Sequence, residues 1–303
     1  MNVDIKDQRI GLLMAGGAGT RLLPLTQVTN KHLLAVFDKP MIYYSLSLIM
    51  LAGIREVVVI TSEQHLPSLK ALLGSGNQWG IEIQYIMQYQ PEGLPQAYTL
   101  SENLTKGRKT MLVLGDNLLV GDGLADILRH RSDSEQNFVL ACKVSDPENY
   151  GVLIENSGKI SLHEKPKQLE TGYAIPGIYF LDETAPEKAK LLSKSKRGEF
   201  EIIELLSAYN DIHELYYEKL GRGYAWLDAG SHERLLDASN YVSILQRRQK
   251  ILIGSPDEIA YRNGWISVSN LRENIESYKS SSYSNVLKIL LNEVTLSSTI
   301  DQK

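Results

Sequence analysis

At 303 residues, with 43% hydrophobic and 22% charged residues, the chain is long enough to bury a large core and lies far from the composition of disordered proteins. The formal net charge of -4 argues against a dedicated nucleic-acid binder, because such proteins usually carry a basic excess. The single cysteine, Cys142, excludes an intramolecular disulfide and a cysteine-rich zinc site. The N-terminus is polar and mixed in charge, unlike a secretory signal, so we expect a cytoplasmic protein.

Short apolar runs alternate with helical patterns through the first half of the chain. Strands are predicted at Ile10–Ala15, Val57–Thr61, Ile81–Met87 and Met111–Leu114, and helices at Met41–Ala52, Pro67–Leu73 and Pro95–Leu104. The apolar run that begins at Met41 is shorter than the roughly 20 residues a bilayer needs, so we interpret it as a core helix and expect no membrane partner. Alternating strands and helices predict a mostly parallel sheet covered on both faces.

The second half of the chain is more mixed. Strands are predicted at Val139–Lys143, Gly151–Glu155, Lys159–His163 and Ile178–Leu181, and helices at Glu201–Tyr209 and Glu233–Arg247. From about Ile251 the pattern becomes helical and polar. We therefore predict an α/β catalytic domain over residues 1–250 and a small C-terminal helical portion, residues 251–303, packed on it.

A glycine-rich loop, Gly16-Gly17-Ala18-Gly19-Thr20, follows the first strand and leads into Arg21. Consecutive glycines after a buried strand let the backbone turn sharply and bring bare N–H groups against phosphates. The loop fits neither the dinucleotide fingerprint, because Leu22 stands where the third glycine belongs, nor the Walker A motif, because no Gly-Lys-Ser/Thr follows. We interpret it as a phosphate-binding turn that delivers Arg21; the alternative is a plain strand-to-helix turn with a solvated arginine.

Seven separated blocks, this loop among them, resemble the sugar-1-phosphate nucleotidyltransferases, and most closely the short-form glucose-1-phosphate thymidylyltransferases. The blocks are GGAGTRLLPLT (16–26), NKHLL (30–34), DKPMIYY (38–44), LGDN (114–117), EKP (164–166), RGEFEI (197–202) and GRGYAWLDAG (221–230). The resemblance implies a Rossmann-like mixed, mostly parallel sheet flanked by helices. It also implies attack of a glucose-1-phosphate oxygen on the α-phosphorus of dTTP, which yields dTDP-glucose and expels pyrophosphate.

The resemblance further implies the roles of individual residues. Arg21, Lys31 and Lys165 are the expected catalytic cations. The nucleotide is expected to contact Gly16, Gly17, Gly19, Thr20, Gln88 and Gly93, and the sugar phosphate to contact Tyr150, Gly151, Glu164, Lys165 and Arg197. Asp116 and Asp228 are the expected Mg²⁺ carboxylates. Small-molecule substrates are the expected partners, together with further copies of the chain in a homotetramer.

The chemistry of the reaction is consistent with these residue types. Two anions must meet, and unit charges about 4 Å apart interact by about 4 kcal/mol at an effective dielectric near 20. Positioning and electrostatics should therefore dominate catalysis. Asp116 follows an apolar strand, which places it at the carboxyl end of the sheet, and Mg²⁺ accepts two carboxylates together with waters and phosphate oxygens. Taken alone, each aspartate could be a turn residue and Lys31 a solvated charge.

Two alternatives keep the fold but change the function. The same chemistry could use UTP or another sugar-1-phosphate, since base and sugar choice depends on a few side chains. A catalytically silent homologue could serve as a ligand-binding or regulatory subunit, although all the charged site residues are present.

The match to the family also has departures. His32 stands where the family usually has glutamine and could add pH dependence near the ordinary histidine pKa of about 6.5. The segment 118–123 differs from the family's regulatory site, whereas Pro256, Glu258 and Arg262 are retained. We therefore expect feedback inhibition by a downstream nucleotide sugar to be weakened or altered.

Overall fold

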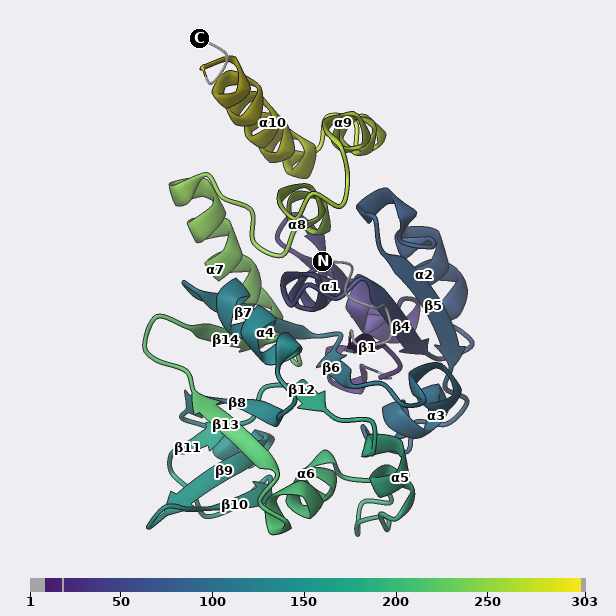
Figure 1. Cartoon of the computed structure of the whole chain (residues 1–303), viewed down its shortest axis with the longest axis vertical. Helices are drawn as coiled ribbons and strands as arrows, with labels where there is room; N and C mark the ends of the chain where they lie inside the picture. The colour runs from purple at the N-terminus through teal and green to yellow at the C-terminus, as the bar shows by residue number, and fades with distance from the viewer. Residues whose placement is uncertain (1–8, 18, 301–303) are drawn as a thin grey trace.

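The computed structural model describes residues 9–17 and 19–300, with side chains described up to residue 292. Within these residues the main sheet has ten strands, in the order β10-β9-β11-β8-β12-β6-β1-β4-β5, and β13 pairs with β8 (Figure 1). Their bounds are β1 Ile10–Met14, β4 Glu56–Thr61, β5 Glu82–Met87, β6 Thr110–Leu114, β8 Asn137–Val144, β9 Gly151–Asn156, β10 Lys159–Glu164, β11 Gly172–Ala174, β12 Ile178–Leu181 and β13 Leu215–Lys219.

The sheet is mixed. Strands β6, β1, β4 and β5 run parallel to one another, and β13 is parallel to β8. Strand β12 is antiparallel to both β6 and β8, and β11, β9 and β10 continue the sheet with antiparallel pairing. The predicted fold class, a Rossmann-like mixed sheet flanked by helices, is confirmed.

Helices cover both faces of the sheet. The helices α1 (Met41–Leu51), α2 (Leu66–Leu73) and α4 (Leu124–Asp133) share one core cluster, and α3 (Gln96–Thr105), α5 (Ala185–Lys190) and α6 (Ile202–Asp211) share the other. Strand β1 is buried on both sides: Leu13 belongs to the first cluster, whereas Leu12 and Met14 belong to the second. This follows from the two-residue period of a strand and explains why its sequence is continuously apolar.

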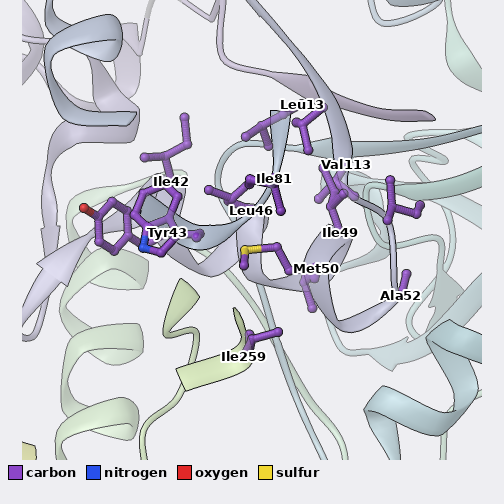
Figure 2. Close-up of a cluster of buried hydrophobic side chains, with 14 of the residues drawn as sticks. Leu13, Ile42, Tyr43, Leu46, Ile49, Met50, Ala52, Ile81, Val113 and Ile259 are labelled. Carbon is purple, nitrogen blue, oxygen red and sulfur yellow. The ribbon is translucent and has the colours of Figure 1, made fainter. Parts of the chain in front are cut away.

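The apolar run at Met41 is a core helix, as predicted. Its residues Ile42, Leu46 and Ile49 are fully buried, and Figure 2 shows them packed among Leu13, Val113 and Ile259. Helix α1 is therefore covered by the sheet on one side and by α8 (Pro256–Arg262) on another. No helix in the described part of the chain is long and apolar enough to cross a membrane.

The C-terminal part is helical. After α7 (His232–Gln249) come α8, α9 (Val268–Ser277) and α10 (Ser282–Ile300), with α10 leading away from the sheet in Figure 1. Asp257 of α8 is fully buried and accepts hydrogen bonds from Asn274 Nδ2 and Tyr283 Oη, each 2.8 Å long, which link α8 to α9 and α10. Ile259 of α8 belongs to the same core cluster as α1, so the C-terminal helices pack on the sheet domain. The domain boundary at residue 250 stays a prediction.

Several short elements were not predicted from the sequence. They are β2 (Ala35–Val36), β3 (Lys39–Pro40), β7 (Asn117–Val120), β14 (Ala225–Asp228), β11, β13, α4 and α5. The antiparallel pair of β7 and β14 matters most, because it sets Asn117 opposite Asp228. Two segments far apart in the chain thereby meet beside the carboxyl end of β6.

Candidate active site

A cleft of about 400 Å³ lies at the carboxyl ends of the parallel strands. The sequence-predicted residues on its wall are Gly17, Gly19, Thr20, Arg21, Lys31, Gln88, Gly93, Asp116, Glu164, Lys165 and Arg197. The remaining four adjoin residues of this wall: Gly16 lies against Gln88, Tyr150 and Gly151 lie beside Lys165 and Glu164, and Asp228 lies beside Gly230. The structure thus brings together residues from six of the seven sequence blocks, all except DKPMIYY (38–44).

The glycine turn packs tightly against two of the predicted side chains. Gly19 has a positive φ of 61°, and a Cβ there would lie 2.9 Å from Thr26 Cγ2 and 3.1 Å from Lys31 Cβ. A Cβ at Gly16 would lie 2.1 Å from Gln88 Oε1. Both positions therefore need glycine, since a side chain would displace Lys31 or Gln88.

Lys31 is held in a short helical turn, Lys31–Leu33, that is fixed to the end of β1. The Asn30 side chain accepts a hydrogen bond from the backbone N–H of His32 (2.7 Å) and donates one to the carbonyl of Ala15 (3.1 Å). From this turn the Lys31 Nζ forms an ion pair with Asp116 Oδ2. Lys31 is only 7% exposed, so this charge is poorly screened by solvent.

The two predicted metal carboxylates are brought together by β7 and β14. Asp116 precedes β7, Asp228 ends β14, and the backbone N–H of Ala229 donates to the carbonyl of Asp116 at 3.4 Å. Burial acts to raise the pKa of Asp116, but the charge of Lys31 holds that pKa below its ordinary value. Burial raises the pKa of Asp228, and the nearby charge of Asp116 adds to this rise. The two carboxylates therefore interact electrostatically.

This donor set fits Mg²⁺. Among the described residues, no group of three or more His, Cys, Asp or Glu side chains could hold a metal ion. Two carboxylates supplemented by phosphate oxygens and waters are, however, a ligand set that Mg²⁺ accepts in phosphoryl-transfer sites. Because burial and the charge of Asp116 both disfavour ionised Asp228, a divalent cation near the pair would relieve the repulsion.

Arg21 approaches the same place from the glycine turn. A Cβ placed on Gly230 would lie 3.1 Å from Arg21 Nη2 and 3.3 Å from Asp228 Oδ2, so the absence of a side chain at Gly230 leaves room for both groups. Arg21 is exposed on the cleft wall, where its guanidinium can reach a bound anion.

Of the predicted sugar-phosphate residues, Glu164, Lys165 and Arg197 line the cleft, and with the adjoining Tyr150 and Gly151 we call them the sugar-phosphate wall. Glu164 Oε1 lies 3.1 Å from Arg197 Nη2 and 3.6 Å from Lys165 Nζ. The backbone N–H of Lys165 donates to the carbonyl of Tyr150 at 2.9 Å, and Gly151 faces Glu164 across the β9–β10 pair. All five predicted residues are therefore neighbours.

Gln88 and Gly93 lie where the cleft meets α3. Gln88 is buried, and its Nε2 donates to Gln96 Oε1 at 2.5 Å. Gly93 has a φ of 116° and forms a bridge with Phe200, whose carbonyl oxygen would lie 2.0 Å from a Cβ. Their expected contacts with the nucleotide stay predictions.

The environment of His32 differs from the one expected from the sequence. Its ring is buried, with Nδ1 2.6 Å from Asn30 Oδ1, and burial lowers its pKa to about 4. A Cβ at Gly115 would lie 2.6 Å from its Cδ2, so the ring packs beneath the strand end that carries Asp116. The expectation that His32 titrates near pH 6.5 is wrong, because a buried imidazole resists protonation.

Sequence reasoning missed three charged residues around the site. Arg234 pairs with both Asp228 and Asp146, and Glu201 accepts from Arg197 Nη2 at 2.6 Å. Glu201 lies inside the RGEFEI block and could have been singled out there. Nothing in the sequence indicates the Arg234 contacts, because Asp146 is remote from Arg234 in the chain.

Fold and cleft together define a nucleotidyltransferase: a glycine turn, two neighbouring carboxylates and facing cations at the edge of a Rossmann-like sheet. The chain belongs to the nucleotidyl transferase family, which it matches over residues 10–243.

Individual relatives narrow the class. The chain is 46% identical to the glucose-1-phosphate thymidylyltransferase of Xanthomonas campestris pv. campestris (strain B100), an alignment that covers 87% of this chain and 90% of the relative. It is 42% identical to the enzyme of the same name from Neisseria meningitidis, with coverage of 93% and 99%.

Two solved structures share the fold of this chain. A crystal structure assigned as a glucose-1-phosphate thymidylyltransferase from Bacillus anthracis, in complex with a sucrose, superimposes with a TM-score of 0.70 at 35% identity over 77% of this chain and 94% of that chain. A UDP-glucose pyrophosphorylase complexed with UDP-glucose gives a TM-score of 0.68 at 24% identity, over 80% of this chain and 100% of that one, and shares the fold.

Proposed function

We propose that the protein transfers a thymidylyl group from dTTP to glucose-1-phosphate, with release of pyrophosphate and with Mg²⁺ as cofactor. The observation that carries the proposal is the cleft itself, where Lys31, Asp116 and Asp228 meet beside the glycine turn and face Lys165 and Arg197. The relatives that match along most of the chain carry the name of this activity.

The geometry supports a division of labour between the two walls. The backbone N–H groups of the glycine turn, with Arg21 and Lys31, bind the triphosphate and stabilise the charge that develops on the pyrophosphate. On the other wall Lys165 and Arg197 bind the sugar phosphate and direct one of its oxygens at the α-phosphorus. In-line attack then needs no covalent help from the protein, because positioning and charge compensation lower the barrier.

Asp116 and Asp228 would hold the Mg²⁺. Mg²⁺ held there would supply positive charge that offsets the charge of the phosphates. Lys31 forms an ion pair with Asp116 and Arg234 with Asp228, and these ion pairs offset part of the cost of burying the two carboxylates.

The alternatives differ in substrate or in activity. UTP or another sugar-1-phosphate would use the same cations and carboxylates, since these contact phosphates alone. A silent homologue is disfavoured because Arg21, Lys31 and Lys165 all line one cleft. The tetramer and the cytoplasmic location stay predictions.

A pyrophosphate-release assay tests the proposal. Each of dTTP, UTP, ATP, CTP and GTP is paired with glucose-1-phosphate, glucosamine-1-phosphate or galactose-1-phosphate, with Mg²⁺ or with EDTA. We expect the highest kcat/KM for dTTP with glucose-1-phosphate and no turnover in EDTA. A higher kcat/KM for another pair would reassign the substrates. No pyrophosphate release with any pair would favour the alternative that the protein is a catalytically silent homologue.

A further inference from the structure

Arg234 occupies an unusual position behind the cleft. It lies in the first turn of α7, where its backbone N–H contacts the capping Ser231 Oγ at 3.4 Å, and its side chain returns towards the end of β14. Its Nη1 donates to Asp228 Oδ2 at 2.9 Å and its Nη2 to Asp146 Oδ2 at 2.6 Å. Arg234 does not itself line the cleft.

The same guanidinium also covers an aromatic ring. Its Cζ lies 5.4 Å from the centroid of the Tyr150 ring, and the ring of Trp226 lies 4.8 Å from Tyr150. Arg234 therefore joins Asp228 to both ends of the segment Asp146–Tyr150. Arginine suits this role because its planar fork serves two acceptors while its face stacks on a ring, whereas a lysine offers one point charge.

The segment Asp146–Tyr150 leads directly into the sugar-phosphate wall. The Tyr150 carbonyl accepts from the backbone N–H of Lys165, which has a positive φ of 46° and so depends on its neighbours to hold it. Gly151 then pairs with Glu164, which contacts Arg197. A shift of the segment would therefore move the groups expected to grip the sugar phosphate.

We propose that Arg234 is a positioning residue for the sugar phosphate: it ties the carboxylate of Asp228 to the segment Asp146–Tyr150 and so fixes the sugar-binding wall relative to the α-phosphate. The inference rests on the proposed function. The ion pairs and the ring contact of the Arg234 side chain fall on this segment and on the end of β14, whereas the nucleotide wall is built from the turn after β1 and from the end of β5. The sugar end should therefore feel its loss more than the nucleotide end.

Binding measurements separate the two ends. Calorimetric titrations with dTDP-glucose and with dTMP, both in EDTA, compare the wild type with Arg234→Gln, Arg234→Lys and the control Arg248→Gln, an exposed arginine of the same helix. Arg234→Gln is expected to weaken dTDP-glucose binding about tenfold and dTMP binding less than about threefold, because only dTDP-glucose carries the sugar and its phosphate to the sugar wall. Arg234→Lys should rescue part of the loss, and Arg248→Gln should match the wild type.

Kinetics give a second, independent readout. In Arg234→Gln the KM for glucose-1-phosphate should rise several-fold more than the KM for dTTP. A purely structural defect would instead lower the amount of active enzyme and leave the ratio of the two KM values unchanged. Asp146→Asn, which leaves the ion pair to Asp228, should shift the same constant in the same direction. If Arg234 and Asp146 act through one contact, the free-energy change of the double variant Arg234→Gln/Asp146→Asn, taken from its KM for glucose-1-phosphate, should be smaller than the sum of the two single changes.

Equal losses of dTDP-glucose and dTMP affinity, or unchanged dTDP-glucose affinity in a folded variant, would overturn the inference. Thermal melting shows whether Arg234→Gln folds, and Asp146→Asn carries the test if it does not. Synthesis of dTDP-glucose by the wild type is measured separately, so failure of the proposed function is distinguishable from failure of this inference.

Discussion

Replacement of Lys31 by alanine should reduce turnover by two to three orders of magnitude. Lys31 is buried, forms an ion pair with Asp116 and lies against the glycine turn, so its charge acts where the triphosphate is expected. Its Cβ lies next to Gly19 of the turn, and its Nζ pairs with the carboxylate of Asp116. The expected effect is therefore on the reaction more than on the fold.

The magnitude follows from two estimates. Removal of one preorganised electrostatic contact in an active site typically lowers kcat by about 10²–10³, or about 2.7–4 kcal/mol. A unit charge about 4 Å from a developing charge is worth about 4 kcal/mol at an effective dielectric of 20, and the low exposure of Lys31 limits screening. Both estimates apply to the transition state, where charge on the departing pyrophosphate is greatest.

The assay is continuous pyrophosphate release at saturating dTTP, glucose-1-phosphate and Mg²⁺, which isolates kcat from binding. Lys31→Arg keeps the charge but alters its position, so its turnover should fall between the two others. Lys288→Ala, an exposed lysine of α10, is the matched control and should not differ from the wild type. Turnover of Lys31→Ala within a factor of three of the wild type would refute the assigned role.

Three further predictions follow from the site. Gly19→Ala should destabilise the protein by about 1–2 kcal/mol in urea melts, because the residue has a positive φ and meets Thr26, whereas Gly17→Ala, with no atom within 4 Å of its Cβ, should not. Because burial lowers the pKa of His32 to about 4, the unfolded chain binds a proton at higher pH than the folded chain, so the free energy of unfolding should fall as the pH drops from about 6.5 towards 4. His32→Gln should flatten this decline and leave the pH–rate profile between pH 6 and 8 unaltered. An equally steep decline in His32→Gln would contradict the lowered pKa of His32. Titration with dTDP-rhamnose should give weak or altered feedback inhibition; strong inhibition that is non-competitive with the substrates would defeat that hypothesis.

The sequence by itself determined the fold class and most of the cleft. The apolar runs at Ile10–Ala15 and Met111–Leu114 indicate buried parallel strands because every side chain in them must face a covered surface. Local chemistry was equally readable at the glycine turn, where a positive φ at Gly19 needs a residue without a side chain. Asp116 could be placed at the edge of the sheet because it directly follows such a strand.

The tertiary structure alone decided which distant groups meet. The β7–β14 pair is four residues on each side, too short to give a strand pattern, yet it sets Asp228 beside Asp116. The burial of His32 and the double ion pair of Arg234 also depend on segments that become neighbours only after folding. Periodicity reports which side of an element is buried, but charge pairing and pKa depend on which elements pack there, and that is settled by the three-dimensional arrangement of the whole chain.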